Sequence, residues 1–344
     1  MFDSLALCGI MKKILKHLFL GLVLTGLTAW GALALYYGDS MTSSWQTGFA
    51  VLFGLSGILA ILNTLGFYRR FRYFWVHLAL FIIVLIGWLC ISPSNDRAWQ
   101  PDVAKLAHAT VDGDQITLHN IRNFDYRSEF DYDPAYYDKT FNVSKLEEVE
   151  LLAFYWMGPA IAHTILSFNF GEQGRLAVSI ETRKELNEEY STIKGFFRQY
   201  ELMYIVADER DVIRLRTNYR NNPPEQGYLF KPNGGKENGR RLFLSYIEKI
   251  NELYEKPTFY NTLLDNCTVA IWVRTWVNAE HLAFSWKILL SGYLPEYLYE
   301  SKRLDQTLPF AELQRRAHIN PLAKAAGDAD DFSTRIRANY PPLE

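Results

Sequence analysis

Apolar residues are concentrated near the N-terminus of the chain. Residues 14–36, 47–67 and 74–92 form three runs with almost no charged side chain. Each run has about the 20 residues that a helix needs to cross the hydrocarbon core of a bilayer. A charge buried in lipid costs at least ~2.5 kcal/mol, so this lack of charge predicts three transmembrane helices.

Basic residues flank these runs unevenly, which predicts an orientation. Lys12, Lys13 and Lys16 lie just before or at the start of the first run. Arg69, Arg70 and Arg72 lie between the second run and the third. The loop 37–46 has no Lys or Arg. By the positive-inside rule the N-terminus and the second loop are cytoplasmic, and everything after Ser92 lies on the opposite side.

Two alternatives concern the start of the chain. The first apolar run could be a cleaved signal peptide, but it lacks a clear small-x-small cleavage site and two more runs follow it. Met11 is an alternative start to Met1, since it opens the more usual sequence MKKILKHL. The preferred interpretation is a membrane anchor over residues 1–92.

The remaining residues, 93–344, have the size of one domain. Residues 93–105 are expected to be a linker, and residues 281–344 give only weak signals of mixed helix and coil. Two apolar, β-prone runs, IAHTILSFNF (161–170) and RLAVSIET (175–182), are joined by GEQG and predict a β-hairpin. The strand pattern resumes over residues 202–219.

Helices are predicted in three places. Residues 143–156 have helical spacing behind Asn142 or Ser144, and residues 240–256 repeat apolar positions at helical spacing. A third helix is expected to begin near Asn266–Cys267. Together with the hairpin, these elements predict an α+β domain in which helices flank an antiparallel sheet.

Cys267 is the only cysteine after the apolar runs, so it has no partner for a disulfide within the soluble region. It is expected in the first turn of the third helix, capped by Asp265 or Asn266. Unpaired backbone N–H groups and the helix dipole favour a thiolate at this position. A thiolate used for acyl transfer also needs a proton acceptor, usually a histidine held by a third polar group.

His163 is the best candidate for that acceptor. It opens an apolar strand, where an imidazole is a poor choice for packing alone. With the hairpin turn centred between Glu172 and Gln173, His163 pairs near Thr182, so Glu181 and Arg183 become its cross-strand neighbours. Of these, Glu181 can accept a hydrogen bond from the imidazole. The alternative is that Cys267 and His163 are ordinary structural residues, as most isolated cysteines and histidines are.

Other chemistries have little support in the sequence. There is no HExxH, no CxxC and no clustered histidine, so no metal or other cofactor is expected. Acidic and basic residues nearly balance, at 38 and 36, which makes nucleic acid an unlikely partner. The basic segment RLRTNYR (214–220) is interpreted as charge-balanced surface or an internal ion-pair network.

Four segments resemble the Lnb N-terminal periplasmic domain family. They are AIAHTILSFNF, LAVSIETRKE, GFFRQYELMYIVADERDVIRLRTNYR and FYNTLLDNCTVAIW, and the resemblance extends over about residues 95–305. It implies a permuted papain-like cysteine enzyme, similar to the NlpC type. It also implies a periplasmic domain anchored in a bacterial inner membrane.

The resemblance further implies thiol-dependent acyl transfer or hydrolysis, with Cys267 as nucleophile, His163 as base and Glu181 as third member. The named class of the family N-acylates lipoproteins with an acyl chain from phospholipid, but there the membrane helices follow the domain rather than precede it. The alternatives are a peptidase or amidase acting on cell-wall peptide, and a non-catalytic tethered binding module. Asn266 and backbone N–H groups are expected to stabilise an oxyanion, and the aromatic segment 131–141 is either cleft lining or a packed loop.

Overall fold

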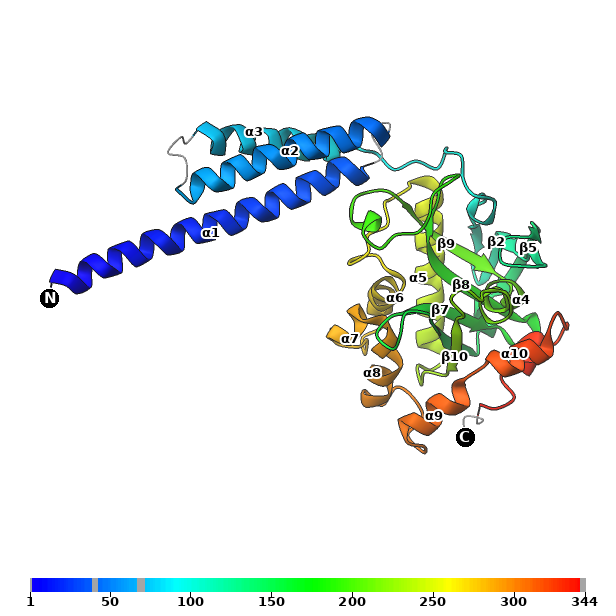
Figure 1. Cartoon of the computed structure of the whole chain (residues 1–344). Coiled ribbons are helices and arrows are strands. Elements are labelled where there is room, and N and C mark those ends of the chain that lie inside the picture. Colours follow the sequence, from blue (N-terminus) through cyan, green and yellow to red (C-terminus); the bar gives the residue numbers. More distant parts are fainter. Residues whose placement is uncertain (1, 39–42, 67–71, 341–344) are drawn as a thin grey trace. The chain divides into compact units, whose positions relative to one another are not determined.

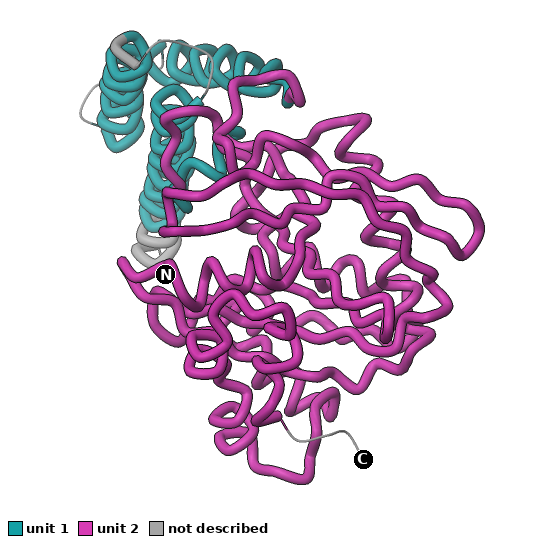
Figure 2. Tube along the Cα trace, turned by 90° about the vertical axis from the view of Figure 1, so that its right-hand side faces the viewer, with its two compact units in different colours: residues 1–93, 191–199 teal, residues 94–190, 200–344 magenta. Residues whose placement is uncertain are grey.

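The computed structural model describes residues 2–38, 43–66 and 72–340 (Figure 1). It divides into two compact units, shown in different colours in Figure 2. The first unit is Met1–Pro93 with Ser191–Gln199, and the second is Ser94–Tyr190 with Tyr200–Glu344. Met1 and the arginines Arg69 and Arg70 lie outside the described residues.

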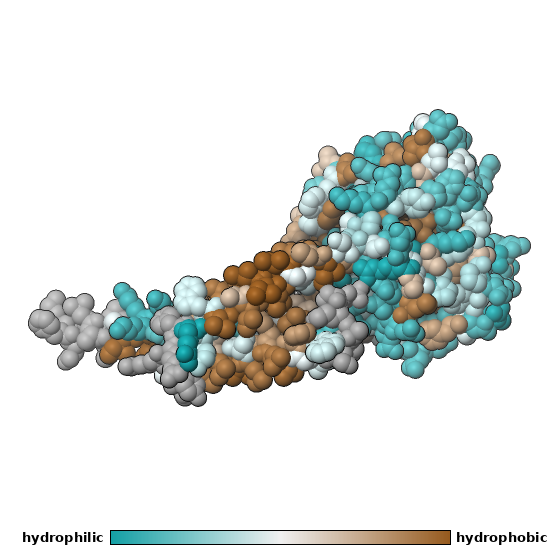
Figure 3. All heavy atoms as spheres, turned by 90° about the horizontal axis from the view of Figure 1, so that it is seen from above, coloured by the Kyte–Doolittle hydropathy of each residue, from teal (hydrophilic) through white to brown (hydrophobic). Residues whose placement is uncertain are grey.

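Three long apolar helices form most of the first unit. They are α1 (Phe2–Tyr37), α2 (Ser43–Thr64) and α3 (Arg72–Cys90). The segments Gly9–Tyr37, Trp45–Thr64 and Arg72–Cys90 are long and apolar enough to cross a membrane. Hydrophobic side chains dominate their visible surface (Figure 3). The prediction of three such helices is confirmed.

A polar contact joins the three helices in their interior. The buried imidazole of His77 on α3 lies 3.0 Å from Thr28 Oγ1 on α1 and 2.9 Å from Ser56 Oγ on α2. Hydrogen bonds between helices contribute about 0.6–2 kcal/mol each in lipid, where a lone polar group would otherwise lack a partner. His77 therefore fixes how the three helices pack against one another.

Residues 191–199 belong to the first unit although the sequence analysis assigned them to the soluble domain. The Phe197 ring lies 6.3 Å from that of Trp30 and 6.0 Å from that of Tyr37. Arg198 Nη1 donates hydrogen bonds to the carbonyl oxygens of Trp88, Leu89 and Ile91, at 3.1, 3.0 and 3.0 Å. A cation at these carbonyls satisfies the C-terminus of α3 and complements its dipole.

The second unit is built on an eight-stranded sheet with the order β1-β2-β9-β8-β7-β6-β10, to which β5 is added by pairing with β2. Neighbouring strands are antiparallel apart from the short parallel contact of β2 with β9. The strands are β1 (His108–Asp112), β2 (Gln115–Arg122), β3 (Asp125–Tyr126), β4 (Tyr132–Asp133), β5 (Tyr136–Asn142), β6 (Glu148–Tyr155), β7 (Ala162–Asn169), β8 (Arg175–Arg183), β9 (Glu201–Ala207) and β10 (Gln226–Phe230). The short strands β3 and β4 pair with each other outside this sheet.

Helices cover both faces of the sheet. They are α4 (Glu209–Arg214), α5 (Lys236–Glu255), α6 (Cys267–Arg274), α7 (Trp286–Leu289), α8 (Leu294–Glu300), α9 (Phe310–Ala317), α10 (Asn320–Ala326) and α11 (Phe332–Arg335). The predicted α+β class, with helices flanking a mostly antiparallel sheet, is confirmed.

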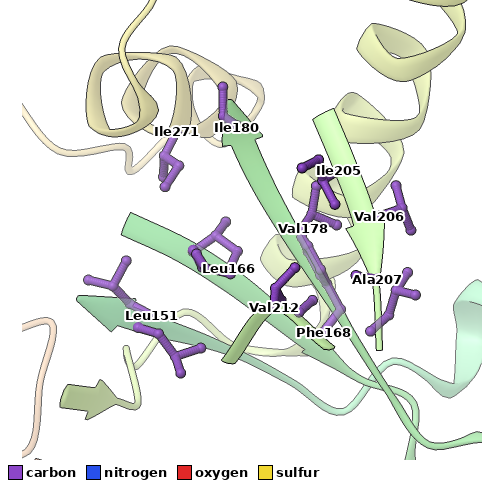
Figure 4. Packing of buried hydrophobic residues seen from close by; sticks show 14 of the residues in the cluster. Leu151, Leu166, Phe168, Val178, Ile180, Ile205, Val206, Ala207, Val212 and Ile271 are labelled. Carbon is purple, nitrogen blue, oxygen red and sulfur yellow. The ribbon is translucent and has the colours of Figure 1, made fainter. Parts of the chain in front are cut away.

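Two consecutive residues of β7 show which helices cover which face, because successive side chains of a strand point to opposite sides. The Phe168 ring packs edge-on against Phe243 and Tyr246 of α5, with centroids 5.2 and 5.6 Å apart. Ser167 Oγ donates a 2.5 Å hydrogen bond to Glu209 on α4. The α5 face also receives α6, whose Ile271 lies over Leu166 and Ile180 in Figure 4.

Two predictions of local structure are wrong. Residues 143–156 are not a helix: a single 3-10 turn (Val143–Lys145), capped by Asn142, precedes strand β6. The middle of β6 is buried on both faces, so its side chains do not alternate between apolar and polar. The strand predicted over 202–219 ends at Ala207, where Asp208 caps helix α4.

Candidate functional site

Cys267 is the first residue of α6, as predicted, and its side chain is partly accessible to solvent. The helix begins there because Asn266 is its N-cap. Asn266 Oδ1 accepts hydrogen bonds from the backbone N–H groups of Thr268 and Val269, at 3.1 and 2.9 Å, and Nδ2 donates to Thr262 O at 3.0 Å. The cap satisfies two of the free N–H groups of the first turn and fixes the orientation of Cys267.

His163 lies one residue inside the start of β7 and is buried, with 8 % of its surface exposed. The β7–β8 ladder pairs Ile165 with Ser179, and its continuation by two residues places His163 opposite Glu181. The hairpin is therefore shifted by one residue from the predicted register, because its turn centres on Glu172 within the 3-10 turn Gly171–Gln173. This shift brings Glu181 closer to the imidazole than predicted.

The predicted third member of the site is in contact with the histidine. His163 Nε2 lies 3.1 Å from Glu181 Oε1 and 2.7 Å from Ser179 Oγ. Ser179 Oγ in turn donates a 2.7 Å hydrogen bond to Glu181 Oε1. With Nε2 engaged in this way, Nδ1 is the ring nitrogen left to interact with the thiol of Cys267, whose pKa His163 lowers.

A buried arginine holds the carboxylate from its other side. Arg216 Nη2 donates a 2.8 Å hydrogen bond to Glu181 Oε1, and its Nη1 lies 2.9 Å from Glu225 Oε2. Arg220 also binds Glu225, at 2.8 Å. Arg216 reaches this position from the π-helical turn Leu215–Tyr219 that follows α4, a distortion often found at functional sites. The sequence interpretation of this segment as an internal ion-pair network applies to Arg216 and Arg220.

The charges of these groups depend on one another. Burial raises the pKa of Glu181, but His163 and Arg216 outweigh it and hold that pKa well below its ordinary value. Burial and Arg216 lower the pKa of His163, but Glu181 and Cys267 outweigh them and raise it to about 9. Burial disfavours ionisation of Cys267, yet His163 and Thr164 lower its pKa to about 7. Between these two values the pair is a thiolate and an imidazolium.

Thr164 supports the thiolate from the neighbouring position on β7. Its side chain and its backbone N–H both contribute to lowering the pKa of Cys267, because hydrogen-bond donors near the sulfur favour its charged form. Thr164 Oγ1 also lies 3.0 Å from Thr268 Oγ1, which ties β7 to the start of α6. Consecutive residues of one strand therefore bring an imidazole and a hydrogen-bond donor to the thiol of Cys267.

Sequence reasoning missed Thr164, Ser179 and Arg216. Thr164 follows His163 directly in the sequence. Ser179 could have been predicted, because it is a polar residue in an otherwise apolar strand, two positions before Glu181. Arg183, predicted as the other cross-strand neighbour of His163, instead donates hydrogen bonds to Val103 O and Ala104 O of the segment before β1.

The other histidines of the second unit have different surroundings. His108 and His119 stack on each other with centroids 4.6 Å apart on the paired strands β1 and β2. His318 Nε2 lies 3.0 Å from Gln226 Oε1, and His281 Nδ1 lies 3.0 Å from Leu282 O. His119 also pairs with a carboxylate, at 2.7 Å from Asp138, so it is the interaction with the thiol of Cys267 that distinguishes His163 from these four.

The aromatic segment 131–141 packs as a small cluster of its own. The ring of Tyr132 lies 5.2 Å from Phe124 and 5.3 Å from Tyr126, and Tyr126 Oη donates to Asp211 at 3.2 Å. Of the two possibilities raised by the sequence, these contacts favour the packed loop over a cleft lining. Within residues 2–38, 43–66 and 72–340, no group of three His, Cys, Asp or Glu side chains could hold a metal ion.

The site therefore combines a cysteine at the start of a helix with a histidine on the adjacent antiparallel sheet. Residues 132–292, which include Cys267, His163 and Glu181, match the family model described as the Lnb N-terminal periplasmic domain. The resemblance seen in the sequence is thus confirmed over residues 132–292, a shorter range than the 95–305 expected. No curated protein and no solved structure matches the chain.

Proposed function

We propose that the chain is a membrane-anchored, cysteine-dependent acyl-transfer enzyme that works on the periplasmic face of a bacterial inner membrane. The observation that carries the proposal is the arrangement of Cys267 at the start of α6, His163 on β7 and Glu181 on β8, in which Glu181 Oε1 lies 3.1 Å from His163 Nε2 and His163 lowers the pKa of Cys267 to about 7. The three apolar helices and the match to a periplasmic domain support the location. Lys12, Lys13 and Lys16 support a cytoplasmic N-terminus.

In the first step the thiolate of Cys267 attacks an ester carbonyl of an acyl donor. A C–S bond forms, the C–O bond of the ester breaks, and the imidazolium of His163 gives its proton to the departing alkoxide. The product is a thioester on Cys267 and a free alcohol. Glu181 and Ser179 keep the imidazole oriented through Nε2 while the proton moves.

In the second step an amine, or water in a hydrolase, attacks the thioester carbonyl. His163 accepts the proton of the incoming nucleophile, an N–C or O–C bond forms, and the C–S bond breaks to return the thiolate. Phospholipid as acyl donor and a lipoprotein amine as acceptor are the substrates that fit the family and the membrane anchor.

The oxyanion of each step needs a donor near the sulfur. The Asn266 side chain uses its oxygen to cap α6 and its amide nitrogen to bind Thr262 O. The backbone N–H of Cys267 heads the helix, where N–H groups have no intrahelical acceptor. We assign the oxyanion to this N–H, with Asn266 acting by holding the first turn in place.

The test is a search for a thioester on the purified full-length protein. Incubation with phospholipid vesicles is expected to add one acyl chain to the peptide that contains Cys267, and neutral hydroxylamine is expected to remove it. Mass spectrometry of the peptides measures both. The adduct is expected to be absent from Cys267→Ser and present in Cys90→Ser, a matched variant of the other cysteine described with a free thiol.

The same experiment separates the remaining candidates. A cell-wall peptidase or amidase needs the same three residues but would be acylated by peptide rather than by lipid. A binding module without catalysis would form no hydroxylamine-sensitive adduct with either donor. Acylation of a residue other than Cys267 would contradict both enzymatic functions.

A further inference from the structure

The second unit exposes large hydrophobic side chains unevenly. Eight of the 15 that are exposed among its described residues fall within the 28 residues from Leu263 to Leu290, out of about 240 in the unit. We call these eight the apolar flank: Leu263, Leu264, Trp276, Val277, Phe284, Trp286, Leu289 and Leu290. Such concentration of apolar side chains on a water-facing domain marks an interaction surface.

The apolar flank surrounds the proposed nucleophile in the sequence. Leu263 and Leu264, which are 47 % and 65 % exposed, precede Cys267 by four and three residues. Trp276 and Val277 lie in the 3-10 turn that follows α6, and the remaining four lie within residues 284–290, in and beside α7. Helices α6, α7 and α8 lie along one side of the sheet (Figure 1). Two members of the apolar flank thus lie within four residues of Cys267 along the chain, and the others lie in the segments that follow α6.

Ring contacts join part of the apolar flank into a single aromatic surface. Trp272 on α6 packs edge-on against Trp276 and Phe284, with centroids 4.9 and 5.6 Å apart. Trp272 Nε1 donates a 2.8 Å hydrogen bond to Leu282 O, so the indole N–H has its acceptor within the protein. Trp276 and Phe284 remain 52 % and 59 % exposed, because they are held outward by this packing.

The chemistry of the apolar flank matches the interface of a bilayer. Tryptophan is enriched at the boundary between lipid and water, where its ring is buried among acyl chains and headgroups. Charge is sparse and balanced over residues 263–290, with two acidic and two basic side chains: Asp265, Glu280, Arg274 and Lys287. Burial of such a surface in lipid is favourable, because it removes apolar area from water without leaving an isolated charge in the lipid.

Chain length places a bilayer within reach. Only residues 91–93 separate the end of α3 at Cys90 from the start of the second unit at Ser94. An extended segment of that length spans roughly 10 Å. A domain tethered so closely to membrane-spanning helices meets lipid at a much higher effective concentration than any soluble partner.

We propose that the apolar flank docks onto the phospholipid bilayer that the chain's own helices cross, so that Cys267 opens toward the lipid interface. Acyl chains of the outer-facing leaflet then enter the site directly, without passing through water. The assignment of phospholipid as acyl donor rests on the proposed function, whereas the contact with the bilayer does not.

The experiment uses the full chain in nanodiscs of phosphatidylethanolamine and phosphatidylglycerol. A photo-reactive p-benzoylphenylalanine replaces Trp286 in one variant and Val111 in another, since both residues are 54 % exposed. A third variant carries it in place of Leu264. The expected result is a phospholipid adduct at 286 and 264 and none at 111, measured by mass spectrometry of the illuminated protein.

Two results would overturn the docking. One is lipid labelling at 286 and 264 no greater than at 111, and the other is crosslinking of these positions to a second copy of the chain instead of lipid. All three positions are exposed, so an aromatic replacement there leaves the core intact. Normal unfolding temperatures of the variants check this.

Repeating the crosslinking in Cys267→Ala separates docking from catalysis. Lipid adducts are expected to persist in this variant, while the thioester is lost. Failure of the thioester test with lipid adducts retained would contradict the proposed function and leave the docking in place. Loss of the adducts with the thioester retained would contradict only the docking.

Discussion

Glu181 Oε1 lies 3.1 Å from His163 Nε2 on the neighbouring strand, and the same oxygen accepts a 2.8 Å hydrogen bond from Arg216. Arg216 thus holds the carboxylate of Glu181 in the position where it contacts the imidazole of His163. This arrangement keeps the pKa of Glu181 low and lets its negative charge act on the imidazole throughout the neutral range.

Replacement Glu181→Gln is expected to lower kcat/KM about 10²-fold or more, because the amide neither orients nor stabilises the imidazolium. Since Glu181 is a cause of the raised pKa of His163, its removal lowers that pKa and moves the alkaline limb of the pH–rate profile to lower pH. Glu129→Gln is the control, since Glu129 reaches the network only through Arg220. An unchanged alkaline limb in Glu181→Gln would exclude this role.

Alkylation of Cys267 by iodoacetamide is expected to accelerate through a midpoint near pH 7, because His163 and Thr164 lower its pKa to about 7. The pH–rate profile of acyl transfer is expected to rise through that pH and fall above about 9, where the raised pKa of His163 is crossed and the imidazolium is lost. In His163→Ala the alkylation midpoint moves upward. A midpoint near 9 in the unaltered protein would contradict the ion pair.

Replacement Asn266→Ala is expected to lower the free energy of unfolding by about 1 kcal/mol, because the N-cap of α6 is lost. Asn266→Asp retains a capping oxygen and thus most of the stability, but its charge disfavours the thiolate and raises the pKa of Cys267. Thermal unfolding and the alkylation profile measure the two effects separately. Equal alkylation profiles in the original protein and Asn266→Asp would show that residue 266 does not act on the thiol.

Arg337 near the C-terminus is expected to stabilise the second unit strongly. It lies 2.5 Å from both Glu150 and Glu209, two fully buried carboxylates. Arg337→Ala removes the cation shared by the two carboxylates, leaving Glu150 with Arg175 at 2.6 Å and Glu209 with the Ser167 hydroxyl, and is expected to cost about 3–5 kcal/mol in denaturant unfolding. Arg335→Ala, which removes the exposed pair with Asp331, should cost at most about 1 kcal/mol. Equal losses in the two variants would contradict this difference.

The sequence predicted the features that depend on local pattern. Hydropathy alone located the three membrane helices, helical periodicity located α5, and the capping signal at Asn266 located the start of α6. The pair His163 and Cys267 came from the types of residue and their surroundings, supported by the family resemblance. The hydropathy, periodicity and capping signals each lie within one short stretch of chain, so tertiary packing does little to alter them.

The errors concern features that packing decides. Strand β6 was predicted as a helix because a strand buried on both faces gives no alternation. The one-residue shift of the β7–β8 hairpin depends on the 3-10 turn at Gly171–Gln173. Arg216 reaches Glu181 only because α4 continues into a π-helical turn, and nothing in the segment RLRTNYR specifies that distortion.

The contacts of residues 191–199 have a consequence for how the chain can be divided. Both flanking strands, β8 and β9, lie in the second unit, yet Phe197 packs on Trp30 and Tyr37, and Arg198 binds the last carbonyls of α3. A fragment that began at Ser94 would lose these partners for a loop that starts only a few residues after Glu181. Residues 191–199 thus take part of their packing from the helices of the first unit, and removing those helices would leave this loop without its aromatic and carbonyl partners.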